Sequence, residues 1–111
     1  MIEKAHSQQH ALDLQLIKIR QRFPRPRISD VGSAVADALE RCRKHIGPGE
    51  SIAIAVGSRG IANLATIVRS VVMTLQSWNA HPFIVPAMGS HGGGTAEGQR
   101  AVLASYGITA D

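Results

Sequence analysis

The loop at residues 87–95 has the composition of a ligand-binding loop. It reads Ala-Met-Gly-Ser-His-Gly-Gly-Gly-Thr, with glycine at Gly89, Gly92, Gly93 and Gly94. Glycine permits positive φ and close approach of the backbone to a ligand, and the helix expected after the loop offers unpaired N–H groups to an anion. His91, in the middle of the loop, is a candidate general acid or base because imidazole titrates near neutral pH. The loop lacks both the Gly-Lys-Ser/Thr of a P-loop and the spacing of a dinucleotide fingerprint.

A second glycine-bearing loop lies upstream and reads Gly57-Ser58-Arg59-Gly60. A guanidinium binds a carboxylate or phosphate through two parallel hydrogen bonds, so we interpret Arg59, with Ser58 beside it, as a substrate-binding group. If the two loops leave the same edge of a sheet, one small anion could contact both Arg59 and His91.

Alternating strand and helix patterns position these loops. Period-two alternation predicts a strand over 12–19, helical spacing predicts a helix over 30–46 with Asp30 or Ser33 as its cap, and a continuous apolar run predicts a strand over 52–56 that is covered on both faces. A helix over 61–78, a strand over 82–86 and a helix capped by Thr95 and ended by Gly107 complete the order. This order predicts an α/β fold, a Rossmann-like parallel sheet with flanking helices in which both loops lie at the carboxyl edge. Residues 1–11 are expected to be a flexible lead-in, and 12–111 an incomplete amino-terminal domain.

Composition argues against several classes of function. The net charge of +4 comes from a local basic run, Lys18 to Arg27, but the chain has one Trp, one Tyr and two Phe for base stacking, so nucleic-acid binding is not favoured. A single cysteine, Cys42, excludes an intramolecular disulfide and fits a reducing compartment, and no His or Cys pair has metal-ligand spacing. The polar first ten residues lack the apolar core of a signal peptide, and no apolar run reaches membrane-spanning length. We therefore expect a cytoplasmic protein without a membrane segment or a metal site of its own.

Together, the loop at residues 57–63 and the segment 82–93 resemble the amino-terminal domain of the lactate racemase family, in particular a branch with a Met-Gly-Ser-His-Gly-Gly loop. The similarity extends from about Lys18 to the end of the chain through Gln21, Phe23, Pro48-Gly49, Glu97-Gly98-Gln99 and Tyr106-Gly107. The resemblance implies an isomerase: a 2-hydroxy-acid racemase or epimerase in which the α-hydrogen leaves as a hydride to a nickel-pincer nucleotide held between two α/β domains.

The resemblance also implies roles for individual residues. His91 corresponds to the catalytic histidine that takes the hydroxyl proton, and Arg59, with Ser58, lies in the loop that binds the substrate carboxylate. Contacts to the cofactor are expected from Gly89, Ser90, Gly92, Gly93 and Thr95. Lactate racemases carry an acidic residue and a Thr-Arg-Pro element where Ser58-Arg59-Gly60 stands here, so lactate itself need not be the substrate.

The second catalytic histidine, the lysine that tethers the cofactor and the histidine that ligates nickel lie farther along the chain in the family. The expected partners are a small hydroxy acid and a carboxy-terminal domain that this chain lacks, and a homo-oligomer stays open. The chain alone is expected not to catalyse racemisation and to bind no cofactor. A non-catalytic phosphate- or nucleotide-binding module built from the same two loops is the alternative.

Overall fold

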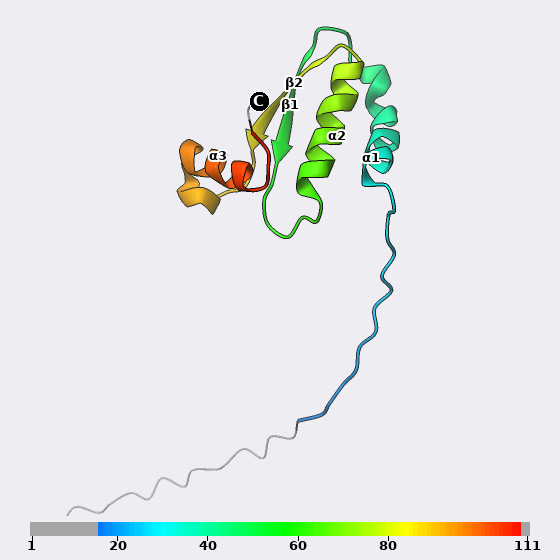
Figure 1. The fold of residues 1–111 in the computed structure, drawn as a ribbon, viewed down its shortest axis with the longest axis vertical. Helices are drawn as coiled ribbons and strands as arrows, with labels where there is room; N and C mark the ends of the chain where they lie inside the picture. Colours follow the sequence, from blue (N-terminus) through cyan, green and yellow to red (C-terminus); the bar gives the residue numbers. More distant parts are fainter. Residues whose placement is uncertain (1–15, 110–111) are drawn as a thin grey trace, which may run out of the picture.

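The structure, a computed structural model, describes residues 16–109. Figure 1 shows its elements in the order helix α1 (Val31–Leu39), 3₁₀-helix η1 (Glu40–His45), strand β1 (Ser51–Val56), helix α2 (Leu64–Ser77), strand β2 (His81–Pro86), 3₁₀-helix η2 (His91–Gly94) and helix α3 (Ala96–Ser105). The predicted α/β class is confirmed. The predicted lead-in at residues 1–11 lies outside the described residues.

The first helix begins where the sequence predicts but is α-helical over only part of the predicted length. The Asp30 carboxylate accepts hydrogen bonds from the Ser33 N–H at 2.9 Å and the Ser33 hydroxyl at 2.8 Å, so Asp30 is the N-cap. After Leu39 the chain tightens into η1, whose side chains are all exposed, so no buried apolar face keeps the α-helical period there. The Arg43 guanidinium lies 5.0 Å from the centre of the Trp78 ring and fastens η1 to the end of α2.

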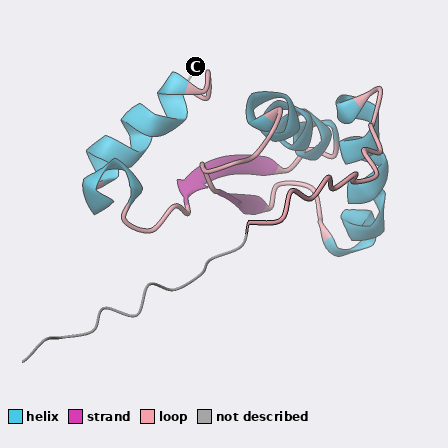
Figure 2. Ribbon diagram, turned by 90° about the horizontal axis from the view of Figure 1, so that it is seen from below, coloured by secondary structure: helices cyan, strands magenta, loops and turns pink. Residues whose placement is uncertain are grey.

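The two strands pair in parallel, with Ser51 opposite His81 and Val56 opposite Pro86. Helix α2 connects them, and Figure 2 shows it lying along one side of the sheet, with α1 beside it and α3 at the other end of the molecule. Helix α2 begins only at Leu64 instead of Ile61, because Asn63 has a φ of 56° and the residues before it form a turn.

The core lies between the sheet and α2 and has two parts. Val56, Leu64, Val68, Leu103 and Ile108 form one buried cluster, and Leu75, Trp78 and Ala80 form the other. Burial alternates along both strands, so every second residue faces this core. On the opposite face Phe83 is 51% exposed and Val85 40% exposed. The prediction that β1 is covered on both faces is therefore wrong for the described residues, because no described element packs on that second face.

The first predicted strand, over residues 12–19, is not formed in the part that the structure describes. Residues 12–15 lie outside the description, and residues 16–19 belong to an extended arm, 16–29, that leaves the body of the molecule in Figure 1. Leu16 is 99% exposed and Ile17 83% exposed. Leu16 and Ile17 are adjacent, so in an extended chain they point to opposite sides. The alternation of apolar and polar residues therefore changes phase here, and the segment cannot present one apolar face to a sheet. Within residues 16–109 the sheet has two strands, and the three-stranded Rossmann-like arrangement is not present there.

The outer edge of β2 is poorly suited to pairing with a further strand. The N–H groups of His81 and Ala87 donate to Glu50 and Val56 on the β1 side, at 2.7 and 2.8 Å. Because successive residues of a strand point their amides to alternate edges, the amides of residues 82, 84 and 86 face outward. Pro82 and Pro86 have no N–H, so this edge keeps one donor, that of Ile84. No helix within the described residues is long and apolar enough to cross a bilayer.

Candidate functional site

The loops that follow β1 and β2 leave the same edge of the sheet. The strands are in parallel register up to Val56 and Pro86, and the Ala87 N–H donates to the Val56 carbonyl at 2.8 Å just where both strands end. The carboxyl ends of parallel strands share an edge, so this pairing fixes the start of both loops next to each other. The predicted placement of the two loops at one edge is confirmed.

A hydrogen bond between side chains joins the two loops. The Ser58 hydroxyl oxygen lies 2.5 Å from Nδ1 of His91, although the residues are 33 positions apart in sequence. Ser58 is 4% exposed and is the buried polar residue of the described chain, whereas His91 is half-buried. Ser58, predicted to touch a substrate, is therefore placed against the imidazole, and it holds one of the two ring nitrogens.

Arg59 lies next to this contact and is exposed to solvent. Its backbone follows Ser58 directly, and Gly60 after it has a φ of 68°, so the chain turns sharply there. The structure thus carries the arginine on the loop that contacts His91. A guanidinium on an exposed turn can bind an anion, and an imidazole on the contacting loop can supply a further hydrogen bond.

The glycine-rich loop is held in shape by its own contacts and by α3. Gly89, Gly92, Gly93 and Gly94 all have positive φ, between 58° and 71°. The Gln99 side chain donates to the Gly89 carbonyl at 2.7 Å, and the His91 N–H donates to the Met88 carbonyl at 3.1 Å. The first part of the loop is thus closed by a turn at Met88 and fastened to α3 through Gln99.

Two glycines come together where the loop meets α3. A β-carbon on Gly92 would lie 2.5 Å from the carbonyl carbon of Gly98, and one on Gly98 would overlap the carbonyl oxygen of Gly92. Thr95 caps α3 by accepting from the Gly98 N–H at 3.1 Å, and its hydroxyl donates to the Gly92 carbonyl at 3.3 Å. The prediction of Thr95 as the cap is confirmed, and Gly98 has a structural role that the sequence analysis, which names it only within the resemblance, did not predict.

The predicted cofactor-contacting residues divide into two groups. The Gly92 carbonyl and the Thr95 hydroxyl are engaged in these internal contacts, while Gly89, Ser90 and Gly93 are exposed. Gly94, which was not among the predicted residues, is exposed as well. Exposed glycines beside the amino-terminal end of α3 leave N–H groups accessible to an anion. Within residues 16–109 no group of three or more His, Cys, Asp or Glu side chains could hold a metal ion, and Cys42 is exposed on η1.

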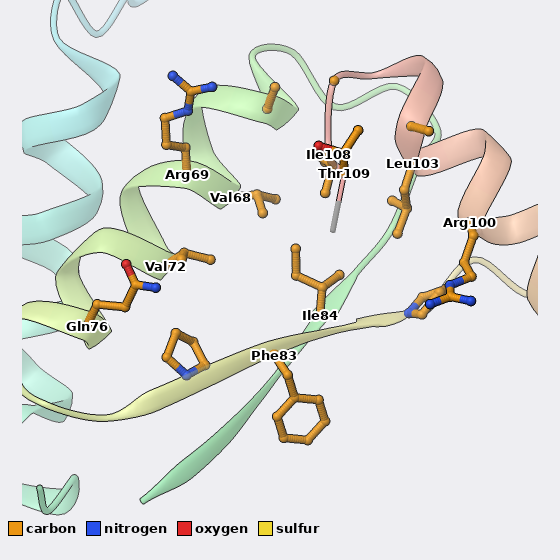
Figure 3. A pocket seen from close by; sticks show the side chains of 15 residues that line it. Val68, Arg69, Val72, Gln76, Phe83, Ile84, Arg100, Leu103, Ile108 and Thr109 are labelled. Atoms are coloured by element: carbon orange, nitrogen blue, oxygen red, sulfur yellow. The ribbon is translucent and has the colours of Figure 1, made fainter. Parts of the chain in front are cut away.

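A separate groove lies between α2, β2 and α3 (Figure 3), with a cavity volume of about 740 Å³. Its floor is apolar, formed by Val68, Val72, Ile84 and Leu103, and Arg69 and Arg100 lie on the two helices beside it. None of the predicted site residues lines it. No motif marks these arginines in the sequence, since each is a single basic residue on a helix, so only the packing of α3 across the end of β2 identifies the groove.

No protein-family model matches the chain, and no curated protein and no solved structure is significantly similar to it.

Proposed function

We propose that the carboxyl edge of this sheet binds a small 2-hydroxy acid, as the amino-terminal part of a racemase or epimerase. The observation that carries the proposal is the contact between Ser58 and His91, which puts an oriented imidazole on the loop next to Arg59. In this proposal Arg59 binds the carboxylate, and His91 exchanges a proton with the oxygen on the adjacent carbon. The substrate class and the reaction type in this proposal come from the resemblance of both loops to the lactate racemase family.

The nickel-pincer nucleotide implied by that resemblance would supply hydride transfer at the α-carbon. The described residues do not fit it by themselves. No cluster of metal ligands is found among them, and their two lysines, Lys18 and Lys44, lie in the arm and in η1, away from the glycine-rich loop in Figure 1. In the family that the two loops resemble, the tethering lysine and the nickel ligand lie farther along the chain. The proposed function therefore rests on what this chain's own groups do: bind, orient and exchange a proton.

The test is a titration of the chain with three anions, followed through the ring signals of His91 by NMR. Lactate serves as the simplest 2-hydroxy acid, propionate has the same carboxylate without the hydroxyl, and inorganic phosphate represents the alternative class. We expect lactate to bind more tightly than propionate. Replacing Arg59 by Gln is expected to weaken lactate binding about tenfold, because a charge-assisted hydrogen bond is lost.

Arg69→Gln is the matched control, since it removes the same charge from an exposed position on α2 beside the groove of Figure 3. Equal effects of the two arginine variants would contradict the role of Arg59, and equal affinity for lactate and propionate would contradict recognition of the 2-hydroxyl group. Phosphate binding much tighter than lactate binding would instead favour a phosphate- or nucleotide-binding module that uses the exposed Gly93 and Gly94 amides.

A further inference from the structure

The hydrogen bond between Ser58 and His91 carries information about the protonation state of the imidazole. A neutral histidine ring has one N–H and one bare nitrogen, and a hydroxyl can donate to the bare nitrogen or accept from the N–H. The partner of a ring nitrogen therefore selects the tautomer. Here the partner of Nδ1 is a serine hydroxyl that is almost fully enclosed by protein.

The two arrangements differ in how well they satisfy Ser58. If the hydroxyl donates to Nδ1, its proton is bonded and the ring carries its own proton on Nε2. If Nδ1–H donates instead, the hydroxyl proton needs another acceptor, and within residues 16–109 the hydrogen bond to His91 is the one that the Ser58 side chain makes. A buried polar hydrogen without a partner loses its hydrogen bond to water on folding and gains none in return, which is unfavourable. The first arrangement is favoured on this ground.

We infer that Ser58 is a positioning residue that fixes neutral His91 as the Nε2–H tautomer. The ring then offers a hydrogen-bond donor, not a lone pair, to whatever binds beside it. This deepens the proposed function and rests on it for the identity of the ligand: the resting imidazole is prepared to donate to a carboxylate or carbonyl oxygen. Nε2 can remove a hydroxyl proton only after the ring changes to the other neutral tautomer, in which the Nε2 proton is lost to solvent and Nδ1 gains a proton from solvent. The Ser58 hydroxyl can then rotate and accept from Nδ1–H, which a methyl group cannot do.

The tautomer can be measured without any ligand. In protein labelled with ¹⁵N-histidine, at a pH where the rings are neutral, long-range ¹H–¹⁵N spectra separate a bare, pyridine-type nitrogen from a protonated, pyrrole-type nitrogen. We expect Nδ1 of His91 to be fully pyridine-type. The exposed rings of His45 and His81 are internal references for a freely exchanging mixture of tautomers. A pyrrole-type Nδ1 on His91, or a mixture like that of the references, would overturn the inference.

Ser58→Ala tests the cause. It should move the Nδ1 signal of His91 toward the values of the two reference rings, while Ser77→Ala, which removes an exposed serine hydroxyl on α2, should leave it unchanged. An unchanged signal in a folded Ser58→Ala protein would refute the role of Ser58. If that variant does not fold, the wild-type Ser58 hydroxyl proton decides: a slowly exchanging resonance with a cross-peak to the His91 ring supports the inference, and its absence refutes it. All of these measurements use ligand-free protein, so their failure is distinct from a failure to bind lactate.

Discussion

At the candidate site, the role of Ser58 depends on its contact with another side chain, that of His91. Arg59 and His91 have chemistry that the sequence makes visible, whereas Ser58 acquires its role only by burial against Nδ1 of His91. A serine hydroxyl at this point can either donate or accept, so it can stay hydrogen-bonded to Nδ1 in both neutral tautomers of the ring. At the scale of single residues, the candidate site is an imidazole held by Ser58, with the exposed Arg59 next to Ser58 in the sequence.

A single residue also accounts for an expected pH dependence of folding. Hydrogen bonds from the backbone N–H of Ser33, and then from its hydroxyl, lower the pKa of Asp30 from its ordinary value of 3.8. A carboxylate with a lower pKa in the folded state stabilises the fold above its unfolded pKa, and this contribution is lost as the pH falls through the folded pKa. We therefore expect the denaturant concentration at the unfolding midpoint of the wild type to decrease as the pH is lowered below about 4, in part because the contribution of Asp30 is lost.

Asp30→Asn isolates this contribution. Asparagine is an equally good N-cap that does not titrate, so this variant should keep α1 at pH 7 and lose the part of the acid-dependent decrease that comes from Asp30. Asp30→Ala should be less stable than either protein at neutral pH. The measurement is chemical denaturation at several pH values, with Asp37→Asn, an exposed residue later in α1, as control. Parallel pH profiles for wild type and Asp30→Asn would contradict the assignment.

At the scale of elements, the glycine-rich loop and α3 form one unit. The loop is shaped by glycines with positive φ, fastened by Gln99, and seated on the first turn of α3 where Gly92 meets Gly98. This contact explains why a residue with poor helix propensity stands in a helix. The same contact helps to hold His91 beside Ser58, because each residue lies on a loop that begins at the end of a strand.

Gly98→Ala provides the test of this unit. In an exposed helix the change would stabilise by up to about 1 kcal/mol, yet here we expect a loss of stability of about 1–3 kcal/mol because the new β-carbon overlaps the Gly92 carbonyl. The loss should be accompanied by shifts of the His91 amide signal. Ala101→Gly, at an exposed position of α3, calibrates the ordinary propensity effect. A stabilised Gly98→Ala protein would show that the loop does not sit on α3 in this way.

For the whole molecule, the main property is that the sheet is covered on one face only. Helix α2 contributes to both buried clusters, Val56 of β1 and Leu103 of α3 belong to one of them, and Phe83 and Val85 remain on the opposite face. The prediction of a strand buried on both faces was wrong because a continuous apolar run does not say how many layers the rest of the chain supplies. The alanines Ala53 and Ala55 account for part of that run and tolerate either environment.

Two identical substitutions measure this asymmetry. Val56 is 3% exposed and Val85 is 40% exposed, and they lie on neighbouring strands one register position apart. Val56→Ala should cost about 2 kcal/mol, from two buried methyl groups and the cavity they leave, while Val85→Ala should cost less than about 1 kcal/mol. Urea denaturation of both variants checks this, and each serves as the control of the other. Equal costs would mean that the open face is covered in solution.

The sequence by itself determined the features that depend on near neighbours. Side-chain period, capping chemistry and backbone freedom act over a few residues. They predict the Asp30 and Thr95 caps, the two strands β1 and β2, the end of α3 just before Gly107 and the positions of the two loops. Because parallel strands joined by a helix present their carboxyl ends together, the shared edge of the loops also followed from local order.

Only the tertiary structure decided which groups touch. The bond from Ser58 to His91 and the seat of Gly92 on Gly98 depend on strand register and on loop φ angles, which no local pattern encodes. The extent of α1, the open face of the sheet and the unpaired arm at 16–29 likewise depend on whether a packing partner is present. Local sequence propensity favours a helix or a strand. Whether that element forms, and what it packs against, depends on buried area and hydrogen-bond partners from distant parts of the chain.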